Sequence, residues 1–300
     1  GYLRVGETGA GHFVKMVHNG IEYGIMQLIS ETYDVLKRGL GLNNDELADI
    51  YGKWNQGKLQ SFLIEITSHI FKQKDDKTDK YLIDVILDAA KQKGTGQWTS
   101  QDSMELKIPV PNIDIAVGMR DLSAFREERV VASKILSGPI FQFDTPKNDF
   151  IVKLENAIFF AMITTYSQGM VLLKKASEEY KYNLKLSDIA TIWRGGCIIR
   201  SGLLEDIRAA YDDLPDLPNL LVDPKFSRYL AENQNDIREV ISAAVKMGIP
   251  IPGLSAALAY YDEYRSKKMP TNLVQAQRDF FGSHTYERVD EPGIFHTQWD

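Results

Sequence analysis

The chain has 300 residues, of which 44% are hydrophobic and 25% are charged, a composition typical of soluble globular proteins. Its 35 basic and 41 acidic residues give a net charge of −6, which argues against sequence-independent nucleic-acid binding, because such binding needs many cations on the phosphates. The single cysteine, Cys197, excludes an intrachain disulfide and a cysteine-based zinc site, and it fits a reducing compartment.

Apolar residues recur at three- and four-residue spacings along most of the chain, which predicts an all-α fold. Helices are predicted at residues 13–37, 43–71, 81–91, 149–180, 187–210, 236–247 and 254–267. Asn43 and Glu46 form a capping-box pattern, and Gly248 followed by Pro250 predicts a helix end. Strands and helices do not alternate regularly, so we expect no parallel-sheet domain.

Two stretches of the chain are weakly similar. Residues 42–51 read LNNDELADIY and residues 186–193 read LSDIATIW, and each continues through glycines to an acidic residue, Glu65 or Glu205. Either the likeness is a coincidence between amphipathic helices, or residues 1–268 form two related multi-helix halves, about 1–147 and 148–268. Residues 269–300 lack a helical period but are rich in aromatic side chains, so we expect an extended tail that docks on its own domain or on a partner subunit.

The most apolar stretch, residues 157–173, is shorter than a membrane span and contains polar side chains, so it predicts a buried helix and no membrane association. The N-terminus lacks the charged-then-apolar pattern of a signal peptide. Because the sequence begins without methionine, we expect a fragment of a longer chain.

Five polar side chains share one face of the first predicted helix. At about 100° per residue, Lys15, His18, Asn19, Glu22 and Tyr23 fall within an arc of about 140°. The face offers a candidate base, a candidate acid, an imidazole and an amide, although a lysine acts as a base only when burial or a neighbouring cation lowers its pKa. A solvated polar face is the simpler interpretation. Against it, the arc lacks the repeating Glu–Lys pairs of such a face.

The remaining candidate patterns are weak individually. Lys93 precedes two glycines whose amides could face an anion, but a turn between helices explains the pattern as well. Arg120 is a lone arginine, usually a surface ion pair, whereas Arg278 and His284 in the tail suit a phosphate. The GETGAG segment at residues 6–11 has the wrong glycine spacing for a dinucleotide fingerprint and predicts a hinge.

Two expectations concern metal and sulfur. The five histidines show no ligand spacing, so no metal site is expected. The segment WRGGCIIRS at residues 193–201 predicts a helix end and a glycine turn, with Cys197 as a small buried residue.

Taken together, several segments resemble 6-phosphogluconate dehydrogenase. They are GAGHFVKMVHNGIEYG at 9–24, ILDAAKQKGTGQWT at 86–99, IWRGGCIIRS at 192–201, SAALAYYDEYRS at 255–266 and NLVQAQRDFFGSHTYERVD at 272–290. The segments occur in order over essentially the whole chain, and they resemble only the all-α C-terminal part of that family. Because the family's N-terminal nucleotide-binding domain is outside the sequence, we expect this chain alone to be inactive.

The resemblance implies a cytoplasmic, metal-free homodimer that uses NADP to oxidise and decarboxylate 6-phospho-D-gluconate (6-phosphogluconate) to D-ribulose 5-phosphate in the pentose phosphate pathway. It implies Lys15 as the base and Glu22 as the acid. The implied substrate contacts are His18, Asn19, Tyr23, Lys93 and Arg120, with Arg278 and His284 supplied by the neighbouring subunit. Residues 1–268 would then form the substrate-binding and dimerisation domain, and residues 269–300 a tail that reaches the partner.

Two alternatives remain open. A related β-hydroxyacid dehydrogenase domain would share the Lys-x-x-x-Asn helix, and a non-catalytic all-α dimerisation module would share the fold. The cations Lys93, Arg120 and Arg278 argue against an unphosphorylated substrate. The pairing of Lys15 and Glu22 on one helix face argues against a mere scaffold.

Overall fold

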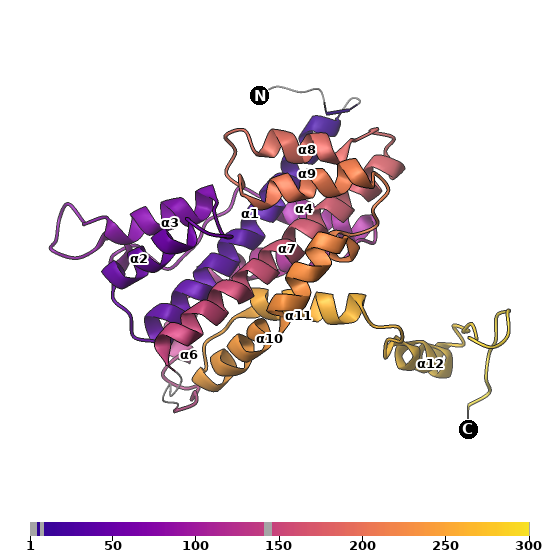
Figure 1. Ribbon diagram of the computed structural model, residues 1–300. Coiled ribbons are helices and arrows are strands. Elements are labelled where there is room, and N and C mark those ends of the chain that lie inside the picture. Colours follow the sequence, from indigo (N-terminus) through magenta and orange to yellow (C-terminus); the bar gives the residue numbers. More distant parts are fainter. Residues whose placement is uncertain (1–4, 7–8, 141–145, 300) are drawn as a thin grey trace. The chain divides into compact units, whose positions relative to one another are not determined.

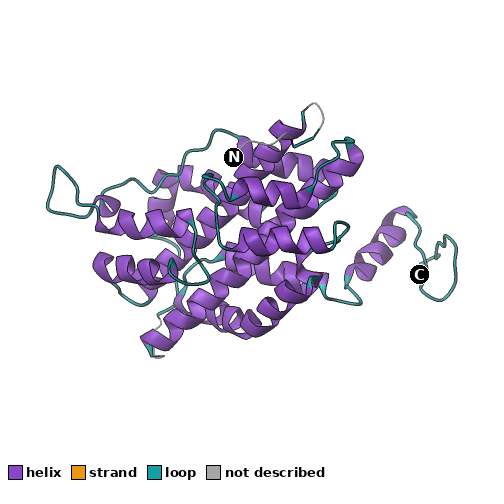
Figure 2. Cartoon of the chain, turned by 45° about the horizontal axis from the view of Figure 1, so that its top comes forward, coloured by secondary structure: helices purple, strands orange, loops and turns teal. Residues whose placement is uncertain are grey.

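The computed structural model describes residues 5–6, 9–140 and 146–299, and the all-α fold predicted from the sequence is confirmed (Figures 1 and 2). Within these residues the only β-type pairings are isolated bridges, Ser61–Ser201, Lys74–Tyr81 and Tyr286–Phe295. The chain divides into two compact units, Gly1–Tyr260 and Tyr261–Asp300, which are described separately. The hinge expected at residues 6–11 lies partly outside the described residues.

The longer helices are α1 (Ala10–Asp34), α2 (Asn44–Trp54), α3 (Phe62–Lys72), α4 (Thr95–Glu105), α5 (Pro111–Ala124), α6 (Arg126–Ala132), α7 (Lys147–Glu179), α8 (Leu186–Trp193), α9 (Leu203–Asp213), α10 (Pro224–Met247), α11 (Pro252–Tyr264) and α12 (Thr271–Gly282). A π-helical turn, η1 (Val35–Gly39), continues α1, and two short 3₁₀ turns are η2 (Leu82–Asp84) and η3 (Leu220–Val222). The predicted capping box of Asn43 and Glu46 at α2 and the helix end at Gly248 are both confirmed.

Two predicted helices are each divided in the structure. The helix predicted at 43–71 is α2 and α3, and the helix predicted at 187–210 is α8 and α9. In both places the chain leaves the helix through a turn, and the two connecting segments meet at an isolated bridge between Ser61 and Ser201. Sequence spacing cannot reveal this break, because the residues on either side keep a helical apolar pattern.

Other differences follow from what each segment buries. The helix predicted at 81–91 is wrong beyond η2, and its apolar side chains Val85, Ile86 and Leu87 are exposed rather than packed. Helix α4 was not predicted because the face that it buries consists of glycine, threonine and serine side chains, which leave no apolar period. The tail, predicted to lack a helix, contains α12, most of whose apolar residues are exposed.

Helix α7 is the central core helix and packs against α1 and α10 (Figure 1). It is long and apolar enough to cross a membrane by composition, but 89% of its apolar window is buried inside the protein, as in the core helix of a soluble protein. The interpretation of residues 157–173 as a buried helix is therefore confirmed.

Helix α1 is fixed in place by glycines at its contacts with other helices. A Cβ on Gly169 of α7 would lie 2.4 Å from Cδ1 of Ile21, and a Cβ on Gly24 would lie 2.7 Å from the Thr165 methyl group. On the side of α4, a Cβ on Gly20 would meet Thr99, whose hydroxyl donates to the carbonyl of Met16 at 2.9 Å. These close approaches hold α1 in one rotation about its axis and so determine which face stays available for chemistry.

The second unit contains α12 and a loop that closes on it. The backbone groups of Tyr286 and Phe295 exchange hydrogen bonds of 2.9 and 2.8 Å, which close the loop. At the end of the loop, the ring of Trp299 lies 5.8 Å from that of Phe280 on α12. A shallow apolar hollow remains on this unit, lined by Leu273, Ala276, Gln277, Phe280, Phe281 and Trp299.

Candidate active site

Four of the polar side chains predicted to share a face of α1 form one connected cluster. Nζ of Lys15 lies 3.3 Å from Nδ1 of His18, and the same Nδ1 lies 3.1 Å from Oδ1 of Asn19. A carboxylate oxygen of Glu22 lies 3.9 Å from that nitrogen. Lys15 is exposed and Glu22 is partly exposed, so the cluster opens to solvent at its amine and carboxyl groups.

His18 is the buried centre of the cluster. Its side chain is 2% exposed, and its ring meets that of Trp193 edge-on at 5.7 Å. Burial and then the charge of Lys15 lower the pKa of His18 to about 4, against the opposing hydrogen bond of Asn19, so the imidazole is neutral near pH 7.

The neutral ring cannot make both Nδ1 contacts as hydrogen bonds at once, since Nδ1 either carries a proton or accepts one. With Nδ1 unprotonated, His18 accepts from the Lys15 ammonium. With Nδ1 protonated, His18 donates to Asn19, and Lys15 can pair with it only as a neutral amine. The other ring nitrogen, Nε2, is buried and has no hydrogen-bond partner among the described residues. The tautomer of His18 is therefore linked to the protonation state of Lys15.

Glu22 has the environment of a proton donor. Burial raises the pKa of its carboxyl, while the charges of Lys15 and then Arg120 act in the opposite direction. A carboxyl group whose pKa is raised keeps its proton closer to neutral pH and can deliver it to a reacting carbon or oxygen.

Tyr23 and Arg120 form the cationic end of the site. The guanidinium of Arg120 on α5 stacks over the Tyr23 ring with its carbon 3.5 Å from the ring centroid, and its Nη2 lies 3.5 Å from Sδ of Met26. Burial lowers the pKa of Arg120, whereas Tyr23 and Glu22 oppose this change. A Cβ on Gly96 of α4 would lie 2.4 Å from the Tyr23 ring, so the glycine makes room for this arrangement.

Lys93 lies just before α4, the helix whose Gly96 meets the Tyr23 ring. It is exposed and directly precedes Gly94, the N-cap residue of α4, whose φ of 93° suits glycine. Helix α4 packs against both α1 and α5. The helices that carry Tyr23 and Arg120 are therefore in contact with each other and with α4, which follows Lys93 in the chain.

The other two predicted site residues lie in the second unit. Nη1 of Arg278 donates to Oε1 of Gln275 at 3.1 Å, and the ring of His284 lies 6.0 Å from that of Phe281. Both of these contacts are made within the second unit.

Sequence reasoning missed two neighbours of the cluster, Trp193 and Cys197. Cys197 is only partly buried, so its description as a small buried residue is wrong. Its Sγ donates to the carbonyl of Trp193 at 3.0 Å, and burial raises the pKa of the thiol, with further effects from Lys15 and Glu22. The end of α8 and the turn after it therefore border the polar face of α1. In the sequence, the only signal of this long-range contact is the motif WRGG at residues 193–196.

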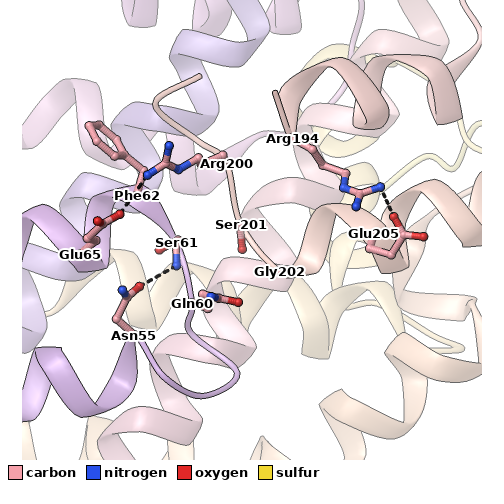
Figure 3. A pocket seen from close by; sticks show the side chains of 10 residues that line it. All are labelled: Asn55, Gln60, Ser61, Phe62, Glu65, Arg194, Arg200, Ser201, Gly202 and Glu205. Carbon is pink, nitrogen blue, oxygen red and sulfur yellow. Dashed lines mark hydrogen bonds and ion pairs between the residues drawn. The ribbon is translucent and has the colours of Figure 1, made fainter. Parts of the chain in front are cut away.

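A separate cavity of about 490 Å³ lies between the turn that joins α2 to α3 and the turn that joins α8 to α9 (Figure 3). Arg200 pairs with Glu65 at 2.9 Å across it, while Arg194 pairs with Glu205. The lining residues are Asn55, Gln60, Ser61, Phe62 and Glu65 from one turn and Arg194, Arg200, Ser201, Gly202 and Glu205 from the other. The cavity contains none of the predicted site residues. Its two sides are formed by the turns that follow the two similar stretches of sequence.

No group of three or more His, Cys, Asp or Glu side chains is arranged to hold a metal ion in the described parts of the chain.

Comparisons with known proteins give one consistent relationship. The family model for the C-terminal domain of 6-phosphogluconate dehydrogenase matches residues 11–299. The chain is 54% identical over 296 residues to the NADP(+)-dependent, decarboxylating 6-phosphogluconate dehydrogenase of Bacillus subtilis (strain 168), covering 98% of this chain and 63% of that protein. It is 52% identical over 295 residues to the decarboxylating 6-phosphogluconate dehydrogenase of Lactococcus lactis subsp. lactis (strain IL1403), covering 98% and 62%.

A solved structure agrees. Plasmodium falciparum 6-phosphogluconate dehydrogenase, described in its apo form and in complexes with NADP+ and with its substrate 6-phosphogluconate, superposes with a TM-score of 0.96 at 45% identity. The match covers 99% of this chain and 64% of that one. The chain therefore spans less than two thirds of the length of these relatives.

Proposed function

Since the chain belongs to the family of 6-phosphogluconate dehydrogenase C-terminal domains, we propose that it is the substrate-binding and catalytic part of an NADP-dependent, decarboxylating 6-phosphogluconate dehydrogenase. The complete enzyme would convert 6-phospho-D-gluconate to D-ribulose 5-phosphate and CO₂ in the pentose phosphate pathway. The observation that carries this proposal is the connected cluster of Lys15, His18, Asn19 and Glu22 beside the Tyr23–Arg120 stack.

Lys15 is the base in this proposal. It accepts the proton of the substrate's 3-hydroxyl as that carbon is oxidised. Neutral His18 supports this role by orienting the amine, because its Nδ1 lies 3.3 Å from Nζ of Lys15 and can form a hydrogen bond with it. Asn19 and His18 then hold substrate hydroxyl groups. After oxidation the β-keto acid loses CO₂, and the Lys15 ammonium returns its proton to the carbonyl oxygen as the enediol forms.

Glu22 completes the reaction by protonating C1 of the enediol, which gives the ketose product. The raised pKa of its carboxyl supports this role, since an acid must hold its proton until the carbon nucleophile forms. Its partial exposure, 18%, leaves the carboxyl accessible to a bound substrate.

The phosphate group of the substrate would lie against Tyr23 on α1, Arg120 on α5 and Lys93, which directly precedes the N-cap of α4; these three helices are in mutual contact. A phosphate dianion favours several cationic donors, and arginine matches its geometry. Arg278 and His284 would complete the site from the partner's tail in a homodimer with exchanged tails. The exposed apolar side chains of α12, such as Leu273 and Phe281, support a docking role for that tail.

NADP, when bound, serves as the hydride acceptor. The described residues contain no strand, glycine turn and helix of the dinucleotide-binding kind, so they do not fit a coenzyme cradle. We infer that a further domain, outside these 300 residues, holds most of the coenzyme. The single cysteine supports a cytoplasmic location for the enzyme.

Phosphate selectivity tests the proposed function. In the complete enzyme, 6-phospho-D-gluconate should support NADPH formation with release of CO₂, whereas gluconate should give a kcat/KM lower by about a hundredfold or more, because several charged hydrogen bonds are lost. Calorimetric titration of the 300-residue chain with both ligands shows how much of the phosphate site is assembled here. Equal turnover of the two substrates by the complete enzyme would contradict the proposal and favour a dehydrogenase for unphosphorylated acids.

A further inference from the structure

One carboxylate in the second unit is contacted by hydrogen-bonding groups from both ends of the closing loop. Asp279 lies on α12 and is completely buried. Its Oδ1 accepts from the backbone N–H of Thr285 at 2.9 Å and contacts Nδ1 of His296 at 2.9 Å. Its Oδ2 accepts from the N–H of Thr297 at 3.0 Å and from the indole N–H of Trp299 at 2.9 Å. Both ends of the loop are thus tied to the same side chain.

The ionised form of Asp279 is the one that this environment favours. Burial alone would raise the pKa of the carboxyl, but the hydrogen bonds from Thr297, His296, Trp299 and Thr285 together hold it well below its usual value. A charged carboxylate therefore persists at the centre of the loop throughout the physiological pH range, and each of its contacts is a charge-assisted hydrogen bond.

The same aspartate determines the conformation of the turn that carries His284. The residues on either side, Ser283 and Thr285, have positive φ angles of 50° and 64°, which are unfavourable for side chains other than glycine and asparagine. The N–H of Ser283 donates to the carbonyl oxygen of Asp279 at 2.9 Å, and the N–H of Thr285 donates to its side chain. Asp279 therefore satisfies both donors of the strained turn.

Gly282 leaves the space that the ring of His284 occupies. A Cβ on Gly282 would lie 2.7 Å from Nε2 of His284 and 2.8 Å from the adjacent ring carbon. The edge contact with Phe281 borders the ring from α12. The space beside Gly282 and the contact with Phe281 therefore restrict the orientation of the imidazole.

Gln275 connects this turn to Arg278. Its amide nitrogen donates to the carbonyl oxygen of Thr285 at 2.5 Å, and its amide oxygen accepts from Nη1 of Arg278 at 3.1 Å. The two predicted substrate contacts of the tail thus belong to one hydrogen-bonded assembly, which runs from Asp279 through Thr285 and Gln275 to Arg278.

We propose that Asp279 is a positioning residue for phosphate binding: it fixes the turn that presents His284, and through Gln275 the side chain of Arg278, to the substrate of the partner subunit. This inference rests on the proposed function. Asp279 touches no substrate atom itself; it acts by keeping two binding side chains in a single arrangement before the substrate arrives, which lowers the ordering entropy of binding.

The primary test is Asp279→Asn in the complete enzyme. Asparagine keeps the volume but removes the charge and turns an N–H group toward donors, so KM for 6-phosphogluconate should rise by about tenfold, with kcat changed by less than about twofold. The matched control is Asp290→Asn, which alters an exposed carboxylate of the same unit that pairs with Arg288 at 2.6 Å. This control should leave both constants unchanged.

A double-mutant cycle separates positioning from general destabilisation. Because Asp279 acts through both His284 and Arg278, adding Asp279→Asn to His284→Ala should raise KM by clearly less than the tenfold expected in the wild-type background, and the remaining rise should disappear when Arg278→Ala is also present. Independent, multiplying effects in the double variant would overturn the inference. Should Asp279→Asn fail to fold, Trp299→Phe removes one of the four donors, keeps an aromatic ring, and should raise KM by about two- to fourfold. An unchanged KM in that variant would count against Asp279.

The outcomes also separate this inference from the function on which it rests. If Arg278→Ala and His284→Ala raise KM but Asp279→Asn and Trp299→Phe do not, only the positioning role is wrong. If none of these variants changes KM while the wild-type enzyme turns over 6-phosphogluconate, the tail does not bind substrate and the positioning role falls with it. If the wild-type enzyme does not use 6-phosphogluconate, the proposed function itself is wrong.

Discussion

At the scale of single residues, burial gives opposite roles to two titratable side chains of the α1 cluster, His18 and Glu22. The pKa of His18 is lowered to about 4, chiefly by burial, which leaves an uncharged imidazole beside Lys15. The pKa of Glu22 is raised, again chiefly by burial, which favours a protonated carboxyl. A lysine that contacts a neutral imidazole, with a protonated carboxyl in the same cluster, matches a reaction that removes the proton of a hydroxyl group and later delivers a proton to a carbon.

The protonation of His18 can be measured directly. Nitrogen NMR of the imidazole should show a neutral ring from pH 8 down to about 5.5, with half-protonation near 4, because the folded environment excludes the charged form. Since this pKa lies below the unfolded value of 6.5, His18 contributes stability that is present above pH 6.5 and is lost as the pH falls toward 4. A titration midpoint near 6.5 in the folded protein would show that His18 is not buried as described.

The residues of the α1 cluster could be predicted from sequence because helical spacing alone places Lys15, His18, Asn19 and Glu22 together. The pKa shifts of His18 and Glu22 could not be predicted in this way. The ring of His18 meets that of Trp193, which comes from a distant part of the chain, and the thiol of Cys197 in the turn after α8 is near enough to interact electrostatically with Lys15 and Glu22. Local periodicity carries no information about such long-range neighbours.

At the scale of helices, the reactive face depends on close packing between α1 and α7. Gly169→Ala should destabilise the protein by about 1–3 kcal/mol, because its new Cβ would meet Ile21 and displace α1. The measurement is denaturant unfolding. As a control, Gly118→Ala lies in helix α5 with open space around it, and it should be neutral or stabilising by about 0.4–1 kcal/mol. Equal effects of the two substitutions would contradict the packing described here.

A buried carboxylate joins α1 to α11. Glu31 is 3% exposed and accepts hydrogen bonds from the backbone N–H groups of Gly253 at 2.6 Å and Leu254 at 2.9 Å, and from the amide of Gln27 at 2.8 Å. Its carboxylate therefore caps the first turn of α11. Burial raises its pKa to about 7 in spite of these hydrogen bonds.

This cap predicts a specific pH dependence of stability. Between pH 4.5 and about 7 the folded protein keeps a proton on Glu31 that the unfolded chain releases, so stability from this group falls as the pH rises through that window. Glu31→Gln should therefore show a smaller decrease in Tm between pH 5 and 7.5 than the wild type. Identical pH dependence in the two proteins would exclude Glu31 as the titrating group.

The sequence predicted helices well where one face is apolar and poorly where the buried face is polar or glycine-rich. The buried residues of α4 include Gly96, Thr99 and Ser103, which give no apolar period although they pack against α1. Conversely, apolar residues near Leu87 suggested a helix but stay exposed. Whether a segment is helical depends here on which neighbour it contacts, and that neighbour is not encoded locally.

At the scale of the whole molecule, the residues predicted for the site are divided between the two units. The α1 cluster and the Tyr23–Arg120 stack belong to the first unit, whereas Arg278 and His284 belong to the second. The proposed exchange of tails in a homodimer would allow each site to receive residues from two chains. Such an exchange would link substrate affinity to dimer assembly. The proposed chemistry itself begins with proton removal by Lys15.

The most direct measurement of that claim is the turnover of Lys15→Met in the complete enzyme, together with calorimetric binding of 6-phosphogluconate. Methionine preserves the length of the side chain but cannot accept a proton, so kcat should fall by about a thousandfold or more while substrate binding stays within about tenfold. Lys175→Met, which alters an exposed lysine on α7 paired with Glu179, serves as the control and should retain full activity. Retention of more than about a tenth of wild-type kcat by Lys15→Met would contradict the account, because another group would then be removing the proton.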